Sequence, residues 1–197
     1  QLLPDLVDAL ERIHRHRRND SDPTYVYIEA YLLRALRRVV ADGGMGVSDA
    51  QRAALGSLED AAPHRPILVT ALELLDSTLP EDGAEGTERW SAPEALPLVE
   101  LLDHDDDAVA RRALRLVHRG VAGDLRELSD KLARLIYEET DIVREHVIPM
   151  LERSADERAR QLLEELTDHD NDAIAEQAEA DLRGLPSSGT ALDGDGE

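Results

Sequence analysis

The sequence predicts an all-α protein of about ten helices, and three observations support this prediction. Leu and Ala dominate the apolar residues, whereas Phe is absent and Trp occurs once, which suits closely packed helices better than a β-sheet. Apolar residues recur at spacings of three and four along most of the chain, as in amphipathic helices. The segment ELLDHDDDAVA at 100–110 also resembles ELTDHDNDAIA at 165–175, an offset of 65 residues. This offset corresponds to two repeats of about 32–33 residues each, and a repeat of this length is typical of a stacked helical array.

The first predicted helix covers residues 2–18 and carries its apolar residues on one face. These residues are Leu3, Leu6, Leu10 and Ile13. The helix ends in a basic cluster, HRHRR at 14–18, and cations at a helix C-terminus complement the helix dipole. A contact to phosphate or nucleic acid is the alternative interpretation of this cluster.

The second predicted helix covers residues 23–41, with Asp22 or Ser21 as N-cap and Pro23 in the first turn. Its predicted core stripe is Tyr25, Ile28, Leu32, Leu36 and Val39. A second line on another face comprises Tyr27, Tyr31, Arg34 and Arg38. Aromatic residues together with Arg are favoured at interfaces. The alternative is that the tyrosines pack against a neighbouring helix and the arginines pair with acidic side chains.

Two further helices are predicted at 48–61 and 66–79. Ser48 is the expected N-cap of the first, and Pro66 opens the second. The residues expected to face inward in the second are Ile67, Leu68, Ala71, Leu72 and Leu75. Residues 80–90 show no apolar periodicity and predict an acidic linker. Trp90 at its end is expected to anchor the loop on the helices rather than to bind a ligand.

Residues 91–185 predict three helix pairs. In the first pair, Ser91 and Glu94 form a capping box and Pro97 is expected to kink the helix that follows. The second helix of this pair covers 107–119. The other two pairs are expected at 125–137 with 141–151 and at 157–166 with 172–182. Residues 186–197 form an acidic tail without periodicity, which is expected to be disordered.

The net charge is −21, from 22 Lys and Arg against 43 Asp and Glu, and Lys131 is the single lysine. This composition resembles that of proteins from salt-accumulating halophilic archaea, in which hydrated carboxylates tolerate concentrated salt and ionic strength screens their repulsion. The alternative is a nucleic-acid mimic or a binder of a basic partner. The absence of cysteine excludes disulfides and thiolate metal sites. No apolar run approaches the roughly 20 residues of a membrane span, so a cytoplasmic location is expected.

The helix pairs and acidic turns resemble the HEAT-repeat family of armadillo-like α-solenoids. The matching residues are Leu96, Pro97, Leu98, Leu101 and Leu102 in a first helix, the turn at 105–107, and Val109 and Ala113 in a second helix. Asp141, Val143 and Arg144 match the family's Asp-x-Val-Arg start of a second helix. The resemblance covers 91–185, and residues 1–79 match only in length and helical period. It implies a right-handed superhelix whose second helices line a concave side that binds proteins. Glu176, where the family has Arg, interrupts an Asp–Arg ladder through the stack.

The acidic turns at 103–107 and 168–172 could also be interpreted as cation sites. A calcium loop needs Gly at its sixth position, where this chain has Ala108 and Ala173. N-capping of the following helices is therefore the main interpretation, and a weak cation site is the alternative. No His-Glu-x-x-His pattern, phosphate loop or nucleophile elbow occurs. We expect no catalytic residue, no cofactor and no metal.

The predicted function is a non-catalytic scaffold or adaptor for a protein partner in a high-salt cytoplasm, monomeric or weakly homo-oligomeric. The partner-binding residues expected from the resemblance are Tyr27, Tyr31, Arg34, Arg38, Arg111, Arg112, Arg115 and Arg144. The first alternative is a nucleic-acid-associated protein that contacts phosphates through Arg15, Arg17, Arg18 and the second-helix arginines. The second is an enzyme of similar fold, such as a bilin lyase or a DNA glycosylase.

Overall fold

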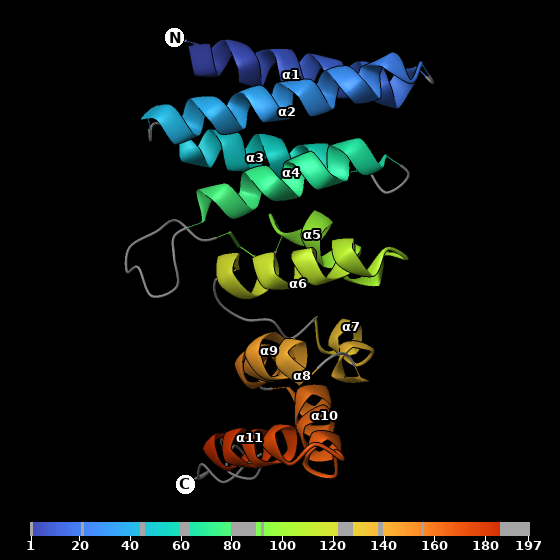
Figure 1. Cartoon of the computed structure of the whole chain (residues 1–197), viewed down its shortest axis with the longest axis vertical. Helices are drawn as coiled ribbons and strands as arrows, with labels where there is room; N and C mark the ends of the chain where they lie inside the picture. Colours follow the sequence, from blue (N-terminus) through green and yellow to red (C-terminus); the bar gives the residue numbers. More distant parts are fainter. Residues whose placement is uncertain are drawn as a thin grey trace, which may run out of the picture. The chain divides into compact units, whose positions relative to one another are not determined.

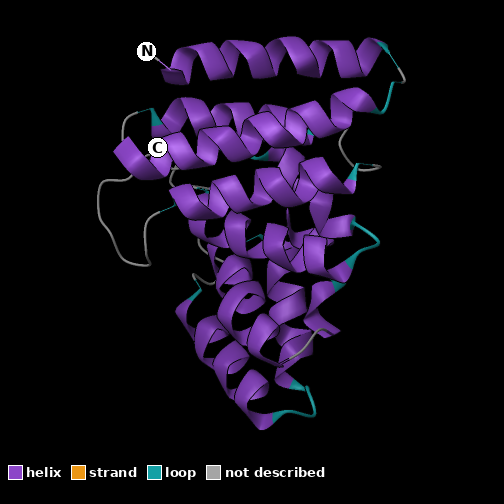
Figure 2. Cartoon of the chain, turned by 45° about the horizontal axis from the view of Figure 1, so that its top comes forward, coloured by secondary structure: helices purple, strands orange, loops and turns teal. Residues whose placement is uncertain are grey.

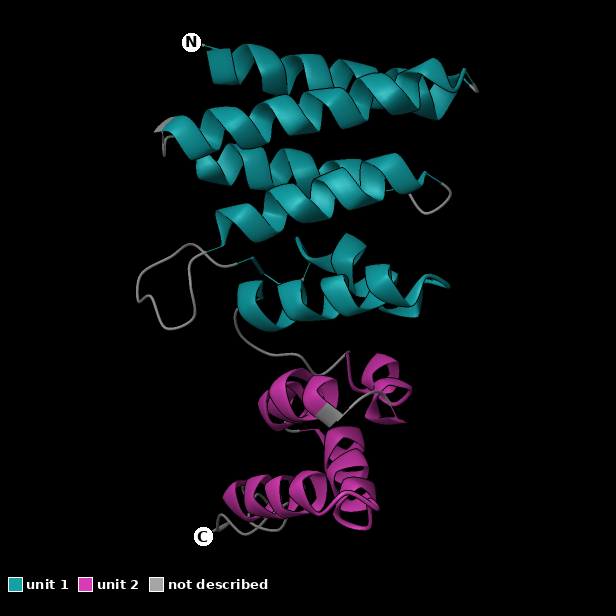
Figure 3. Ribbon diagram, in the orientation of Figure 1, with its two compact units in different colours: residues 1–123 teal, residues 124–197 magenta. Residues whose placement is uncertain are grey.

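The regular elements of this protein are helices (Figures 1 and 2). One isolated β-bridge joins Trp90 and Val121. The computed structural model describes residues 2–20, 22–43, 46–59, 64–79, 90–91, 93–121, 128–137, 140–154 and 156–185, and these statements concern those residues. The all-α prediction is confirmed for them. The chain divides into two compact units, residues 1–123 and 124–197 (Figure 3). This division falls within 91–185, so the first of the three expected helix pairs belongs to the first unit.

The first unit consists of two layers of helices. One layer contains α1 (Leu2–Asn19), α3 (Val47–Leu58) and α5 (Leu96–Glu100), and the other contains α2 (Thr24–Gly43), α4 (Arg65–Thr78) and α6 (Asp107–Gly120). Neighbours along the chain pack together, α1 on α2, α3 on α4 and α5 on α6. Each layer is continuous, because α3 contacts α1 and α5 in one layer and α4 contacts α2 and α6 in the other. The core between the layers consists mainly of leucines, including Leu33, Leu36, Leu68, Leu72, Leu75 and Leu116.

Several predicted boundaries of the first unit agree with the structure to within two residues, namely those of α1, α2, α4 and α6. All five residues expected to face inward in α4 are buried. Asp22 is the expected cap of α2, since its Oδ1 accepts a hydrogen bond from the Thr24 amide at 2.8 Å. Hydrogen bonds from the side chain of Thr24 and, secondarily, from its amide lower the pKa of Asp22, because they stabilise the charged carboxylate. Ser21 lies outside the described residues.

Two predicted helix starts are wrong. Helix α3 begins at Val47, one residue before the predicted cap Ser48, and follows Gly46, whose φ of 82° lies in the left-handed region. A side chain at Gly46 would also meet Leu3 Cδ2 at 2.5 Å, so glycine is required there. Pro97 does not kink a helix, because α5 begins only at Leu96 and Pro97 occupies its first turn, where no amide hydrogen is needed.

The second unit contains shorter and less regular helices. Its elements are α7 (Ser129–Leu132), a 3₁₀ turn (Leu135–Tyr137), α8 (Thr140–Ile142), a π-helical turn (Val143–Val147), α9 (Ile148–Ser154), α10 (Glu157–Thr167) and α11 (Asp172–Gly184). Helix α9 packs against α10 and α11, and α10 packs along α11. The single helix predicted at 125–137 is wrong in its described part, where α7 and a 3₁₀ turn replace it. Pro149 lacks the amide that would bond to the carbonyl of Glu145, which explains a widened π turn directly before it.

The linker predicted at 80–90 and the tail predicted at 186–197 lie outside the described residues, except for Trp90.

Candidate functional site: the exposed face of α2

One face of α2 exposes two tyrosines and two arginines. Tyr27 is 67% exposed and Tyr31 is 70% exposed, and Arg34 and Arg38 are exposed as well. The spacing of four, three and four residues places all four on one side of a helix. The structure therefore brings together the α2 half of the predicted partner-binding set. We refer to Tyr27, Tyr31, Arg34 and Arg38 as the α2 face.

The alternative interpretation, in which these side chains are engaged within the protein, does not hold among the described residues. Arg34 and Arg38 make no ion pair or hydrogen bond there. The neighbouring Arg37 behaves differently, because its Nη1 lies 2.7 Å from Glu73 Oε2 of α4. The α2 face is thus a surface with large exposed aromatic area and two cations that have no anionic partner in the described part of the chain.

The orientation of α2 differs from the predicted one. Of the predicted core stripe, Leu36 alone is buried, and Ile28 is 36% exposed. The residues that actually face the core are Val26, Glu29, Ala30, Leu33, Leu36 and Val40. The prediction failed because it treated a carboxylate as a surface residue, whereas Glu29 has 0% exposure. A charge can occupy the core only when partners compensate it.

Glu29 is compensated by two residues of α1. The Arg17 Nε donates to Glu29 Oε2 at 2.6 Å, and His14 Nδ1 lies 3.1 Å from Glu29 Oε1. Burial raises the pKa of Glu29, but the hydrogen bonds from His14 and Arg17 together with the Arg17 charge outweigh it, and the net pKa is lowered. Arg17 Nη2 additionally donates to the Glu59 carbonyl at 3.2 Å. This cluster locks the rotation of α2 against α1, and so decides which side of α2 faces outward.

The basic cluster at the end of α1 is therefore only partly available to a ligand. Arg17 is buried and committed to Glu29, so the proposed phosphate contact through Arg17 is wrong. Arg18 Nη2 lies 2.9 Å from Glu59 Oε2 in an exposed ion pair. Arg15 is exposed and donates through Nε to the Glu11 carbonyl within its own helix. A hydrogen-bonded core position explains Arg17 better than the helix-dipole interpretation does.

The three predicted arginines of α6 occupy positions of unequal exposure. Arg115 is exposed, whereas Arg111 and Arg112 are half-buried. Helix α4 separates α6 from α2 within their layer. Near the end of α6, Arg119 Nη1 lies 3.0 Å from Asp76 Oδ1 of α4. The α6 arginines are thus not contiguous with the α2 face through a contact between the two helices.

Arg144 lies in the second unit and is tied to α11. Its Nε donates to Gln177 Oε1 at 3.3 Å, and Gln177 Nε2 donates to the Arg144 carbonyl at 3.1 Å. Gln177 thus binds both the side-chain Nε and the backbone carbonyl of Arg144, the arginine of the expected Asp-x-Val-Arg motif. The structure gives Arg144 a role in joining the irregular helix at 140–154 to α11.

The two acidic turns have the same geometry. In the first, His104 Nδ1 accepts from the Asp106 amide at 2.9 Å, and Asp106 Oδ1 accepts from the Ala108 amide at 3.0 Å. In the second, His169 Nδ1 accepts from the Asn171 amide at 3.0 Å, and Asn171 Oδ1 accepts from the Ala173 amide at 3.0 Å. The N-capping interpretation is confirmed. No group of three metal-ligating side chains occurs in the described ranges.

Trp90 anchors the chain onto the helices of the first unit, as predicted. Its side chain is buried, its amide donates to the Gly120 carbonyl at 2.8 Å, and its indole Nε1 donates to Gln51 Oε1 at 3.4 Å. A Cβ at Gly120 would lie 2.4 Å from the indole ring, so the ring rests directly on the backbone of α6.

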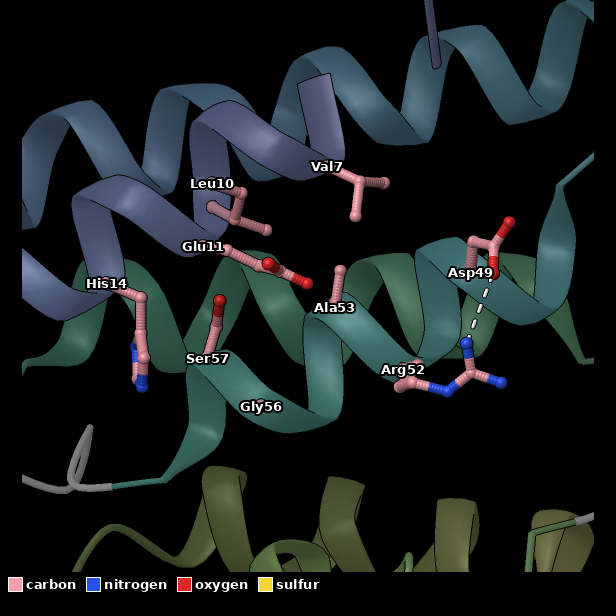
Figure 4. A pocket seen from close by; sticks show the side chains of 9 residues that line it. All are labelled: Val7, Leu10, Glu11, His14, Asp49, Arg52, Ala53, Gly56 and Ser57. Atoms are coloured by element: carbon pink, nitrogen blue, oxygen red, sulfur yellow. Dashed lines mark hydrogen bonds and ion pairs between the residues drawn. The ribbon is translucent and has the colours of Figure 1, made fainter. Parts of the chain in front are cut away.

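Sequence reasoning missed a pocket between α1 and α3 (Figure 4). Its volume is about 350 Å³, and its lining includes Leu10, Glu11 and His14 from α1 and Ala53 and Ser57 from α3. Periodicity assigned Leu10 to the core, but nothing in the pattern marked Ser57, a small polar residue in a helix. The detectable signal was Gly56 beside it, because glycine inside a predicted helix leaves room next to the helix.

Comparisons of the chain with models of protein families, with curated proteins and with solved structures find no match. Among the described residues, no helix has both the length and the apolar character needed to cross a membrane. Because no similar protein is found, the function of the α2 face is argued from the geometry described above.

Proposed function

We propose that this protein is a non-catalytic HEAT-like scaffold, a right-handed superhelix of helix pairs, that binds a protein partner in a high-salt cytoplasm through the α2 face. The observation that carries the proposal is the exposure of Tyr27 and Tyr31 beside Arg34 and Arg38. Tyr and Arg are enriched among the residues that contribute most to protein–protein binding, because they combine large contact area with hydrogen bonding.

The repeat character is supported by the two acidic turns. Equivalent His and Asp or Asn residues, 65 positions apart, make the same pair of hydrogen bonds in front of α6 and α11. The same turn, repeated after two periods of about 32–33 residues, is expected when one helix-pair unit is repeated along the chain. The alternating layers of α1, α3, α5 and α2, α4, α6 in the first unit agree with such repetition.

High salt also favours this mode of binding over phosphate recognition. Contacts between cations and phosphate weaken steeply as salt rises, whereas apolar contact area is strengthened by salting-out ions. The burial of Arg17 removes one of the cations on which nucleic-acid binding would rely. A tyrosine-rich surface retains its apolar contribution under these conditions.

The test is recovery of the tagged protein from extract of its own cells in molar KCl, with and without nuclease, with bound proteins identified by mass spectrometry. We expect a stoichiometric protein that survives nuclease and is lost when Tyr31→Ala and Arg34→Ala are combined. The matched control combines Tyr137→Ala with Arg183→Ala, an exposed tyrosine and an exposed arginine of the second unit. Recovery that disappears with nuclease would replace the proposal with nucleic-acid binding. Equal loss in both double variants would remove the α2 face as the binding surface.

A further inference from the structure

The pocket between α1 and α3 contains a buried hydroxyl group without a hydrogen-bond partner. Ser57 is 2% exposed, and its Oγ makes no hydrogen bond within the described part of the chain. Figure 4 shows this hydroxyl directed from α3 toward α1, into the pocket. Other buried serines are satisfied: Ser154 Oγ donates to the Met150 carbonyl at 3.0 Å, and Ser129 Oγ donates to Asp156 at 2.8 Å. An unsatisfied buried hydroxyl is costly, so Ser57 indicates a missing partner.

A carboxylate without a partner extends into the same space. The Glu11 side chain reaches between the two helices in Figure 4 and makes no ion pair or hydrogen bond among the described residues. The other carboxylate at the pocket, Asp49, is neutralised by Arg52, whose Nη1 lies 3.2 Å from Asp49 Oδ1. Glu11 is exposed, so the pocket carries one carboxylate without an ion-pair partner at its solvent-facing side, near an unsatisfied hydroxyl.

The other walls limit the size of the ligand. Val7 and Leu10 of α1 and Ala53 and Gly56 of α3 form their apolar part. His14 of α1 also lines the pocket, and its Nδ1 is engaged with Glu29 Oε1 at 3.1 Å. Its volume of about 350 Å³ lies at the small end of the range for ligand pockets. A ligand that fits must combine a short apolar chain with a head group that donates hydrogen bonds and carries positive charge.

We propose that this pocket binds a primary alkylammonium ion. The ammonium has three N–H donors and one positive charge, which match the Ser57 hydroxyl oxygen and the Glu11 carboxylate. The alkyl chain lies against Val7, Leu10 and Ala53. A carboxylate ligand is disfavoured by the charge of Glu11, and a neutral alcohol lacks the charge-assisted bond. The pocket lies between α1 and α3, and none of its lining residues comes from α2, so the inference does not depend on the proposed function.

The test is titration of the full chain with n-butylammonium chloride, followed by ¹H–¹⁵N amide shifts, with n-butanol and sodium butyrate as neutral and anionic analogues. Molar KCl screens the unspecific attraction of cations to a chain of net charge −21. We expect saturable shifts at Leu10, Glu11, Ala53 and Ser57 with butylammonium, weaker shifts with butanol and none with butyrate.

Three variants test the assignment of roles, each accompanied by its thermal unfolding midpoint as a fold control. Glu11→Gln is expected to weaken butylammonium binding at least about tenfold, the loss of one charge-assisted hydrogen bond. Asp8→Asn removes an exposed carboxylate of α1 outside the pocket lining and is expected to leave binding unchanged. Ser57→Ala should weaken binding several-fold without lowering the unfolding midpoint, and Ala53→Leu should abolish binding by filling the pocket.

Equal affinity for the three probes, or equal effects of Glu11→Gln and Asp8→Asn, would overturn the proposal. So would the absence of saturable shifts at the four pocket residues, which would show that the pocket contains water only.

Discussion

Arg17 Nε and Glu29 Oε2 lie 2.6 Å apart in the core of the first unit, where Glu29 is completely buried. Removal of one member of such a pair leaves an uncompensated charge in a medium of low dielectric constant, which is costly. His14 completes the cluster through Nδ1. The pair joins α1 to α2 and determines which residues of α2 remain on the surface.

We expect Glu29→Gln to destabilise the protein at neutral pH by about 3–5 kcal/mol, because Arg17 is left buried without its counter-charge. The pKa of Glu29 is lowered from 4.5 in the folded chain, so its contribution is present above pH 4.5 and is lost as pH falls through the lower folded value. The difference in free energy of unfolding between wild type and Glu29→Gln should therefore shrink below pH 4.5. Urea unfolding at several pH values measures it. A difference that stays constant into acid would contradict the assignment of the charge to Glu29.

Two glycines in helices of the first unit should respond oppositely to alanine. A Cβ at Gly120 would meet the Trp90 ring at 2.4 Å, whereas a Cβ at Gly56 meets nothing within 4 Å. Gly120→Ala is expected to lower stability by about 1–3 kcal/mol through overpacking. Gly56→Ala is expected to raise it by about 0.5–1 kcal/mol, since alanine favours the helix. Thermal unfolding of the two variants, with Trp90 fluorescence as a local probe, provides the comparison. The same sign for both would be inconsistent with the packing described.

The equivalent turns before α6 and α11 should contribute similar capping energies. Asp106→Ala and Asn171→Ala each remove the side-chain oxygen that accepts from the amide two residues later. We expect each variant to lose about 1 kcal/mol of stability. Asp105→Ala is the matched control in the first turn, because Asp105 is not the capping residue. If either capping variant were as stable as the control, the two turns would not contribute equal capping energies.

The acidic surface should make stability depend on salt. The chain has a net charge of −21, so its acidic side chains repel one another in the folded state. Salt screens this repulsion, because the Debye length falls from about 10 Å at 0.1 M salt to about 3 Å at 1 M. We expect the unfolding midpoint to rise between about 0.1 M and about 1 M KCl. Sucrose is the control, because it is excluded from protein surfaces and favours compact states but does not screen charge. A larger rise in KCl than in sucrose would assign the effect to charge screening. A midpoint that is unchanged or lower in KCl would exclude adaptation to a salt-rich solvent as the reason for the acidity.

Local sequence patterns were sufficient to predict most of the longer helices and their capping. Apolar spacing located α1, α4, α6, α10 and α11, since these helices have one clear core side. The two acidic turns were predicted to cap the helices that follow them, because a cap is a local interaction, but the capping residues Asp106 and Asn171 were identified by the structure. The exposed α2 face was predicted for the same reason, as a line of large polar and aromatic residues at helical spacing.

The rotation of α2 and the position of the pocket depend on contacts between helices, which local patterns do not encode. Burial of Glu29 depends on Arg17 and His14, which precede it by 12 and 15 residues, and no local pattern encodes that compensation. The broken helix at 129–137 and the late start of α5 likewise depart from local periodicity. The unsatisfied Ser57 hydroxyl becomes visible only when α1 covers α3, because burial is a property of two helices together.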